Sequence, residues 1–418
     1  MKILIIKQHF TSLDQPGIAR LSIFSSLWGR LGHMTSILAG RVIYITGRKA
    51  KARPATALRR EPSRGGVAII RVFDSALGYR TYLGRLISYF SFLPPALIAG
   101  LTLPRPDVII FSSPPTVIGV VAFILGSLRG VPVVFEVRDL WPDVAIDLGF
   151  VKNRLVQRLG YAVESSMYRR AHRIVAISPG MGDFLAREKG VPRNKIAVIP
   201  NPVDLRLTRS RQGMDVRRQM NWGDKFVVLY SGSHSAVYDF DTLLDLAAGL
   251  RSQENILFVL LGDGRQKPQV ARRVEQQQMT NVSLLPPVSK AEVGAIIGAA
   301  DLCIATLKPI NTLRYGYATK IFDYMAMKRP VVLAMDGEAA QLVNEEANCG
   351  IAVGPGQTQA LREAILDLYH DPEKRRSLGE NGYNFVQRHR AADELAQRYL
   401  ELLKAASHAR RIERRRHE

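Results

Sequence analysis

Short apolar runs of strand type alternate along this chain with longer segments of helical periodicity, and the alternation occurs twice. It starts at residues 1–6, stops at Pro-Asn-Pro-Val-Asp in residues 200–204, and starts again at residues 226–230. Strands that alternate with helices predict parallel sheets with helices on both faces. A chain of 418 residues is long enough for two such domains, each with its own core. We therefore expect two doubly wound α/β domains that bind ligands at the carboxyl ends of their strands.

The prolyl segment and the end of the second alternation set the predicted domain boundaries. The first domain comprises residues 1–203 and the second domain residues 204–385. A C-terminal helix is predicted at 386–406, and a basic tail follows at 407–418.

The chain carries a formal net charge of +21, although its composition is otherwise that of a globular protein, with 47% apolar and 23% charged residues. Basic residues cluster in a predicted mobile loop at 47–66 and again at 410–416, without interleaved aromatic residues that stack on bases. We therefore expect no nucleic-acid partner and favour an anionic inner-membrane surface. The other interpretation of this charge is a genome rich in arginine codons.

Two further features predict the compartment. Cys303 and Cys349 lie in apolar, strand-like surroundings, which indicates buried reduced thiols rather than a disulfide. The opening Lys-Ile-Leu-Ile-Ile is a strand pattern and not a secretory signal. We expect a cytoplasmic protein that is peripheral at the inner face of the plasma membrane.

A long apolar segment at 79–103 has an amphipathic pattern that we expect to break at Pro94 and Pro95. It can lie in a membrane interface or pack on the sheet, and the sequence favours neither. We do not expect it to span a bilayer, because two prolines and an arginine interrupt it, nor do we expect this of 117–128, which has only about twelve apolar residues.

The segment 318–332 is the strongest candidate for a ligand site. Its apolar spacing predicts a short helix that begins near Thr319 and ends before Pro330. Lys320 and Asp323 then lie three residues apart on one face. A helix N-terminus with a lysine suits a phosphate, and a carboxylate can accept from both hydroxyls of a ribose. The alternative is a solvated ion pair of little value.

Glycine-containing turns follow several of the predicted strands. Such turns let the backbone approach a phosphate at the carboxyl ends of the strands, where ligands bind. The candidates for donor contacts in these turns are Gly17, Gly232 and Ser233.

Charged residues also follow a buried strand at 133–135, in the run Glu-Val-Arg-Asp-Leu-Trp-Pro-Asp. We interpret Asp139 as the acceptor-side acid/base or orienting group and Arg138 as its partner or a phosphate ligand. The alternative is that Arg138 and Asp139 merely pair with each other. His9 can face the same site but can equally be structural.

Asp239 and Asp241 have the Asp-x-Asp spacing of a metal motif. They stand at the start of an apolar helix, so helix capping is the favoured role, and no metal or other cofactor is expected.

The segment 318–332 resembles the donor-binding helix of the family 4 retaining glycosyltransferases, in the bacterial surface-polysaccharide branch of the N-acetyl-L-fucosamine transferase group. That branch reads Ser/Thr-Lys-Leu-Phe-Glu-Tyr-Met-Ala-x-Gly-Lys-Pro-Val there, and Val-Arg-Asp-Leu-Trp-Pro-Glu where this chain has 137–143. Asp323 stands at the second ribose-binding glutamate of the family. Tyr315 stands at its other motif glutamate and cannot replace it.

The resemblance implies the GT-B fold, in which two Rossmann-like domains face a central cleft, the first on the acceptor side and the second binding the nucleotide sugar. It also implies that the final helix returns to the first domain. In the second domain it implies backbone contacts to the base at the ends of two predicted strands, near Gly262 and Pro287, which are further candidates for donor contacts. Basic residues of the family are missing after Gly232, so diphosphate neutralisation falls to Lys320 and to Lys308 or Arg314.

The implied reaction moves a sugar, with retention and without a metal, from a nucleoside diphosphate sugar to a lipid-linked saccharide in cell-surface polysaccharide synthesis. We expect the donor to be UDP-linked. Two alternatives are a GT-B sugar-nucleotide epimerase, which needs no acceptor, and a non-catalytic basic module that binds membranes or nucleic acid.

Overall fold

The computed structural model describes residues 1–13, 15, 17, 19–42, 58–60, 65–77, 81–208 and 213–415. The chain forms two compact units. Unit 1 contains Met1–Ser12, Ala19–Pro202 and Asp393–Glu418, and unit 2 contains Leu13–Ile18 and Val203–Ala392. Most of the predicted mobile loop at 47–66 lies outside the described residues, but Leu58–Arg60 within it forms a short strand rather than a loop.

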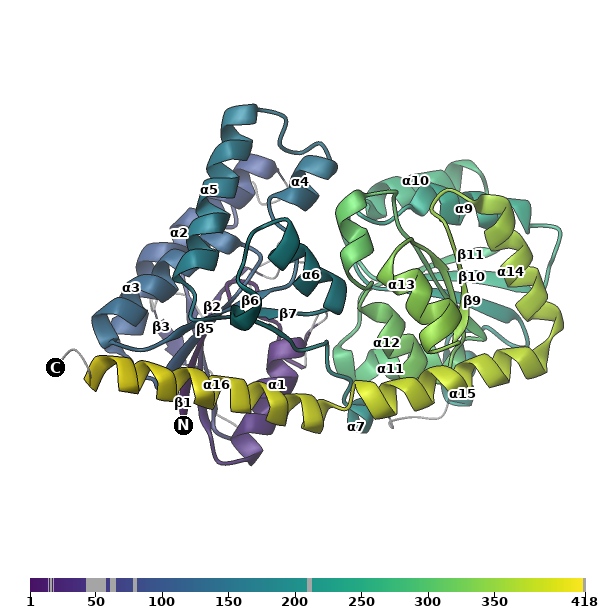
Figure 1. Ribbon diagram of the computed structural model, residues 1–418. Coiled ribbons are helices and arrows are strands. Elements are labelled where there is room, and N and C mark those ends of the chain that lie inside the picture. The colour runs from purple at the N-terminus through teal and green to yellow at the C-terminus, as the bar shows by residue number, and fades with distance from the viewer. Residues whose placement is uncertain are drawn as a thin grey trace. The chain divides into compact units, whose positions relative to one another are not determined.

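Unit 1 is built on an eight-stranded sheet with the strand order β3-β4-β2-β1-β5-β6-β7-β8 (Figure 1). All neighbouring strands run parallel except β3, which is antiparallel to β4. The strands are β1 (Lys2–Ile6), β2 (Met34–Gly40), β3 (Leu58–Arg60), β4 (Val67–Val72), β5 (Val108–Ser112), β6 (Val133–Val137), β7 (Arg173–Ala176) and β8 (Ile196–Val198). The helices are α1 (Arg20–Arg30), α2 (Tyr82–Thr102), α3 (Gly119–Arg129), α4 (Asp143–Asp147), α5 (Arg154–Arg170), α6 (Pro179–Arg187) and α16 (Ala392–Arg415).

Helix α2 corrects one expectation, because it continues through Pro94 and Pro95. A proline inside a helix leaves the carbonyl four residues earlier without its amide partner. Pro94 lies on the exposed side of α2, where water can replace the lost bond, while Phe92 and Ala96 hold the inner side in the core. Packing therefore outweighs the loss of backbone hydrogen bonds.

The final helix also differs from its predicted extent. Helix α15 ends at His389, and α16 then runs to Arg415, so most of the predicted basic tail is helical. The apolar stripe of α16 continues through Leu403 and Ala406, which are buried. Within unit 1, the Trp28 indole donates to the Ala396 carbonyl at 2.9 Å.

Unit 2 is built on a six-stranded, fully parallel sheet with the order β11-β10-β9-β12-β13-β14. Its strands are β9 (Phe226–Ser231), β10 (Ile256–Leu261), β11 (Val282–Leu285), β12 (Leu302–Thr306), β13 (Val331–Ala334) and β14 (Gly350–Val353). Its helices are α7 (Leu205–Thr208), α8 (Gly213–Gln219), α9 (Phe240–Gly249), α10 (Lys267–Gln276), α11 (Lys290–Ala299), α12 (Lys320–Ala326), α13 (Glu338–Gln341), α14 (Thr358–His370) and α15 (Pro372–His389).

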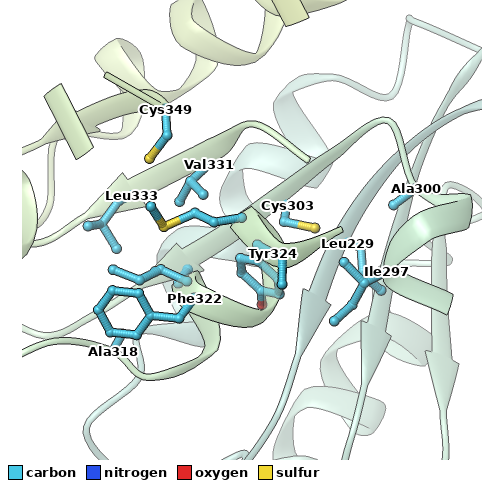
Figure 2. Packing of buried hydrophobic residues seen from close by; sticks show 14 of the residues in the cluster. Leu229, Ile297, Ala300, Cys303, Ala318, Phe322, Tyr324, Val331, Leu333 and Cys349 are labelled. Carbon is cyan, nitrogen blue, oxygen red and sulfur yellow. The ribbon is translucent and has the colours of Figure 1, made fainter. Parts of the chain in front are cut away.

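The core of unit 2 packs α12 directly beneath the sheet (Figure 2). Phe322, Tyr324 and Met325 of α12 are fully buried. The Tyr324 hydroxyl accepts from the Ser231 amide at 2.9 Å, which ties this helix to the end of β9. Cys303 and Cys349 are buried free thiols in the same core, as predicted.

Candidate functional site

The carboxyl ends of β9 and β10 meet in two glycine turns. Gly232 has φ 137° and Gly262 has φ 144°, values that only glycine adopts readily. A Cβ at Gly262 would lie 1.8 Å from the Gly232 carbonyl oxygen, so the two turns touch through their backbones. The Gly232 amide donates to Leu261 and is not free for an anion. The Ser233 carbonyl accepts from the Tyr230 hydroxyl.

Lys320 is the most unusual residue of this edge. It is only 7% exposed, and its Nζ has no hydrogen-bond partner in the described part of the chain. The ammonium instead lies 3.5 Å from the ring centroid of Tyr230 and 3.7 Å from that of Tyr238. Burial holds the pKa of Lys320 well below its usual value. A cation in this position favours the arrival of an anion that can pair with it.

The path to that ammonium runs past Gly232. A Cβ at Gly232 would lie 3.0 Å from the Lys320 Nζ, and the glycine itself is exposed. The missing side chain therefore leaves room above the cation.

His234 lies under the same turn and is fully buried. Its ring packs against Phe240 at 4.6 Å, and both ring nitrogens lack hydrogen-bond partners among the described residues. Burial, assisted by the charges of Lys267 and Lys320, lowers the pKa of His234 to about 3. The imidazole is neutral at physiological pH.

Asp323 does not pair with Lys320, although the two lie on the same short helix. Its carboxylate forms an ion pair with Lys290, the first residue of α11, and remains one-third exposed. The alternative of a Lys320–Asp323 surface ion pair is therefore wrong. An arriving ribose would have to share Asp323 with Lys290 or displace it.

The other predicted donor-site residues lie in loops. Thr319 is half-buried directly before α12, and Pro287 is half-buried after β11. Gly17 lies in a bend after β1, with φ 136°. Lys308 is half-buried and Arg314 is exposed. Their roles stay predictions.

The Asp-x-Asp pair has the predicted helix-capping role. Asp239 caps α9 by accepting from the Thr242 amide at 3.2 Å, and Asp241 pairs with Arg273. Within the described residues, no group of three histidine, cysteine or acidic side chains is arranged to hold a metal ion.

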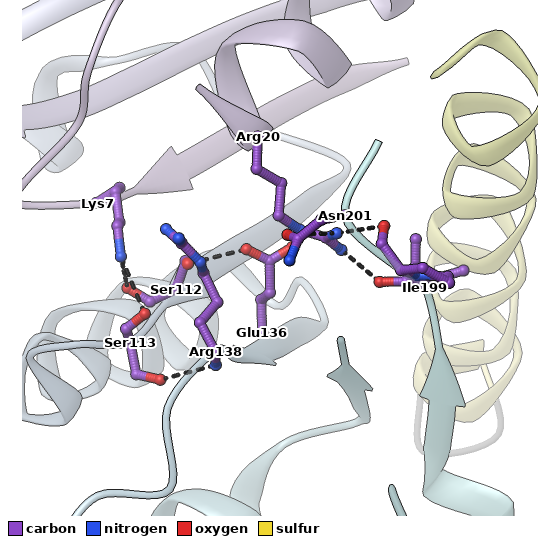
Figure 3. Close-up of polar contacts among 9 residues, drawn as sticks. Lys7, Arg20, Ser112, Ser113, Glu136, Arg138, Ile199 and Asn201 are labelled. Atoms are coloured by element: carbon purple, nitrogen blue, oxygen red, sulfur yellow. Dashed lines mark hydrogen bonds and ion pairs between the residues drawn. The ribbon is translucent and has the colours of Figure 1, made fainter. Parts of the chain in front are cut away.

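The second cluster of charges lies at the carboxyl edge of the unit 1 sheet (Figure 3). Arg138 and Asp139 follow β6, where Asp139 is exposed and the Arg138 amide contacts the Ser113 hydroxyl at 3.4 Å. The Arg138 Nε is buried and has no hydrogen-bond partner in the described structure. Burial lowers the pKa of Arg138, while Glu136 and Asp139 oppose that shift.

Glu136 and Arg20 form a fully buried ion pair beneath this edge, with 2.9 Å between Oε2 and Nε. The Ser112 hydroxyl donates to the other carboxylate oxygen. Burial raises the pKa of Glu136, but Arg20 and Arg138 outweigh that effect and leave it below its usual value. Glu136 is therefore ionised and committed to Arg20.

Lys7 completes this cluster from the end of β1. Its Nζ donates to the carbonyls of Ser112 and Ser113 at 3.1 and 2.9 Å and to that of Pro114 at 3.3 Å. The three donors of the ammonium thus have neutral partners.

His9 also follows β1, and its ring meets that of Tyr89 edge-on at 5.8 Å. Burial, with the charges of Lys7 and Arg85, lowers its pKa to about 3.

Several residues around these sites were not predicted from the sequence. Tyr230 and Tyr238 enclose Lys320, Lys290 pairs with Asp323, and Arg20 pairs with Glu136. For two of these residues the sequence does offer a signal, which is their position. Tyr230 stands at the carboxyl end of a buried strand, and Lys290 stands at a helix start. Nothing in the sequence pattern links Arg20 to Glu136.

Two family matches cover most of the chain. Residues 24–202 match the glycosyl transferase 4-like domain, and residues 215–385 match the glycosyl transferases group 1 domain. The putative colanic acid biosynthesis glycosyl transferase WcaI of Escherichia coli K12 is 24% identical over 59% of this chain. The O-antigen chain mannosyltransferase C of Escherichia coli is 22% identical over 60%. The aligned parts span 63% and 66% of those two relatives.

Solved structures share the fold. HepE of Anabaena in complex with UDP-glucose has a TM-score of 0.71 at 19% identity, covering 97% of this chain and 100% of that one. The sucrose-phosphate synthase of Thermosynechococcus elongatus has a TM-score of 0.74 at 17% identity, covering 98% and 99%. These likenesses confirm the predicted GT-B class, with two Rossmann-like parallel-sheet domains.

Proposed function

Because this chain belongs to the family 4-like glycosyltransferases of the GT-B fold, we propose that it transfers a sugar from a nucleoside diphosphate sugar to an acceptor. UDP is the nucleotide we favour, since HepE, which has this fold, binds UDP and UDP-glucose. WcaI and the mannosyltransferase are named for colanic acid and O-antigen synthesis, which supports an acceptor in cell-surface polysaccharide assembly.

The observation that carries this proposal is the buried Lys320 ammonium beside Gly232, which has no hydrogen-bond partner in the part of the chain that the structure describes. A buried cation without a counter-ion strongly favours an anion that reaches it. A diphosphate supplies that charge, and its charge rises as the bond to the sugar breaks. Lys320 would therefore stabilise the leaving group more strongly in the transition state than in the ground state.

Asp323 lies in the first turn of the same helix, and we propose that its carboxylate accepts from the ribose hydroxyls. Its ion pair with Lys290 gives a way to test this role. If Asp323 binds ribose, Lys290→Met frees the carboxylate and leaves donor affinity unchanged or stronger, whereas Asp323→Ala weakens it.

On the acceptor side, we propose that Asp139 orients or deprotonates the acceptor hydroxyl and that Arg138 binds an anionic group. Asp139 is exposed and directly follows a buried strand, and the Arg138 Nε has no protein partner within the described residues. A lipid-linked saccharide carries phosphate, which a guanidinium binds well. Retention, independence from metals and the N-acetyl-L-fucosamine branch are parts of the same proposal.

Titration calorimetry with UDP and a panel of UDP-sugars tests the donor site. Lys320→Met should weaken binding by about a hundredfold and Asp323→Ala by about tenfold, as expected for charge-assisted contacts. Lys328→Met removes an exposed lysine just beyond α12 and should change nothing. If Lys320→Met and the wild type bound UDP with equal affinity, Lys320 would not be part of the donor site.

Product analysis then separates the reactions. A transferase consumes the donor only with a lipid-linked acceptor, and this should persist in EDTA. Conversion of the donor without any acceptor would favour the epimerase. Mass spectrometry of the products identifies the sugar.

A further inference from the structure

Unit 1 exposes apolar side chains in an unusual concentration. Of the nineteen large apolar residues exposed in the described structure, thirteen lie on α2, α3 and α5. Single exposed apolar residues are normal on soluble proteins, but a cluster marks a surface that binds something.

On α2 the exposed residues form one stripe at positions 83, 87, 90, 98 and 101. Their spacing of three, four or multiples of these places them on one side of the helix. The opposite side is in the core, where Gln8 donates to the Ser88 carbonyl at 3.0 Å. The stripe is therefore the outer face of a helix whose inner face is already packed.

Helices α3 and α5 repeat this arrangement. Val120, Ile124 and Leu128 are exposed at four-residue spacing on α3, and Leu155 and Leu159 are 65% and 58% exposed on α5. Val156 and Val163 widen the α5 stripe.

The three helices are close neighbours (Figure 1). A Cβ at Gly100 of α2 would lie 2.4 Å from Leu125 of α3, and one at Gly119 of α3 would lie 2.6 Å from the Met167 sulfur of α5. The three helices therefore pack side by side, and we treat their exposed stripes together as one surface, which we call the apolar face.

The charges on these helices identify the partner. Arg154 and Arg158 are exposed beside the α5 stripe, Lys152 precedes it, and Arg169 and Arg170 end the helix. Glu164 is the only acidic residue on the three helices; it is buried and paired with Lys189. Exposed aliphatic side chains flanked by cations without exposed carboxylates match an anionic bilayer interface. Eleven of the thirteen exposed residues are aliphatic and only Phe90 and Tyr161 are aromatic, whereas protein interfaces rely more on aromatic anchors than on leucine and valine.

We propose that the apolar face of α2, α3 and α5 inserts into the interface of an anionic phospholipid bilayer. Leu83–Thr102 is also long and apolar enough to cross a membrane, but its inner side packs on the sheet. The insertion is therefore shallow and parallel to the surface. It extends the proposed function, because a lipid-linked acceptor stays in its bilayer and unit 1 carries the acceptor-side residues.

Flotation of the full chain with vesicles tests the proposal. The vesicles are phosphatidylcholine alone or mixed with phosphatidylglycerol, and no sugar substrate is present, so failure here is distinguishable from failure of transfer. Wild type should float, and more strongly with phosphatidylglycerol. Leu155→Ser with Leu159→Ser should lower the partition coefficient at least tenfold on both. Arg154→Gln with Arg158→Gln should lower it only on the anionic vesicles.

The matched control is Leu31→Ser with Met34→Ser, two equally exposed apolar residues outside the three helices, and it should float like wild type. The outcome that overturns the proposal is wild type that stays unbound, or a Leu155/Leu159 variant that floats like the control. A dimer in solution that the Leu155/Leu159 variant dissociates, without flotation of wild type, would also overturn it by assigning the face to a second copy.

A labelled cysteine gives a readout that does not depend on loss of binding. Cys303 and Cys349 are both buried, so a polarity-sensitive maleimide will react with an introduced thiol. The label on Leu159→Cys should shift to the blue with anionic vesicles, and the label on Met34→Cys should not. Equal responses would contradict insertion of this face.

Discussion

Both units bury positively charged side chains at the carboxyl ends of their strands, but the groups that contact these charges differ between the two units. In unit 1, Arg20 pairs with Glu136, and Lys7 donates to three carbonyls. In unit 2, Lys320 has two aromatic rings and no hydrogen-bond partner among the described residues. In unit 1 the buried charges are compensated by groups of the fold itself. In unit 2 no described residue forms a hydrogen bond with Lys320, so an anionic ligand can pair with it.

The two units also differ in how many large apolar side chains they expose. All nineteen exposed large apolar residues of the described chain belong to unit 1, and unit 2 keeps such side chains inside. Unit 1 thus holds Arg20 and Lys7 against polar partners and exposes apolar side chains, whereas unit 2 leaves Lys320 without a hydrogen-bond partner among the described residues. Each departure from ordinary globular packing coincides with a proposed binding role, a bilayer for unit 1 and a diphosphate for unit 2.

The largest expected effect tests the buried Arg20–Glu136 ion pair of unit 1. Glu136→Gln leaves the buried Arg20 guanidinium without its counter-ion, which should destabilise unit 1 by about 3–5 kcal/mol. Differential scanning calorimetry with hydrogen exchange of the β5 and β6 amides measures it. Asp241→Asn breaks an exposed ion pair with Arg273 in unit 2 and should cost less than about 1 kcal/mol. Equal losses of stability in the two variants would show that the buried ion pair of unit 1 contributes no more than an exposed ion pair of unit 2.

A change of opposite sign is expected in unit 2. Lys320→Met replaces a buried ammonium, for which no described residue is a hydrogen-bond partner, with an apolar side chain of similar length, and we expect stabilisation of about 1–3 kcal/mol. The same variant should lose the thermal shift that UDP gives the wild type. Lys328→Met, which removes a surface lysine, should leave both quantities unchanged. Destabilisation by Lys320→Met would mean that the lysine serves the fold.

The sequence predicted features whose cause is local. Apolar runs identified the strands of both sheets except β3, and Lys320 and Arg138 were singled out because they lie in a motif or after a strand end. Tyr230 stands ninety positions before Lys320, and Arg20 stands 116 before Glu136. Such pairings depend on strand order, which periodicity does not encode. The proline pair in α2 was misjudged for a related reason, since burial of the inner face outweighs local propensity.

A smaller effect concerns the acid stability of unit 2. The pKa of His234 falls from 6.5 in the unfolded chain to about 3 in the fold. Between these values the unfolded state binds the proton and the folded state does not, so stability falls as the pH drops from 6.5 toward 3. The slope due to this residue is at most about 1.4 kcal/mol per pH unit. His234→Phe should flatten it in urea titrations, and an unchanged slope would show that His234 is protonated in the fold.

The smallest expected effect on stability is that of a substitution on the exposed side of α2, which we compare with one on its buried side. Leu83 is 66% exposed, so Leu83→Ala should change the free energy of unfolding by less than about 0.5 kcal/mol. Phe92→Ala on the buried side of the same helix should cost about 3–5 kcal/mol. Urea denaturation compares them. A large loss from Leu83→Ala would show that the outer stripe supports the fold, and the apolar face would then need no bilayer to explain it. A loss confined to Phe92→Ala leaves the outer stripe without a role in folding, so that only binding accounts for its exposure.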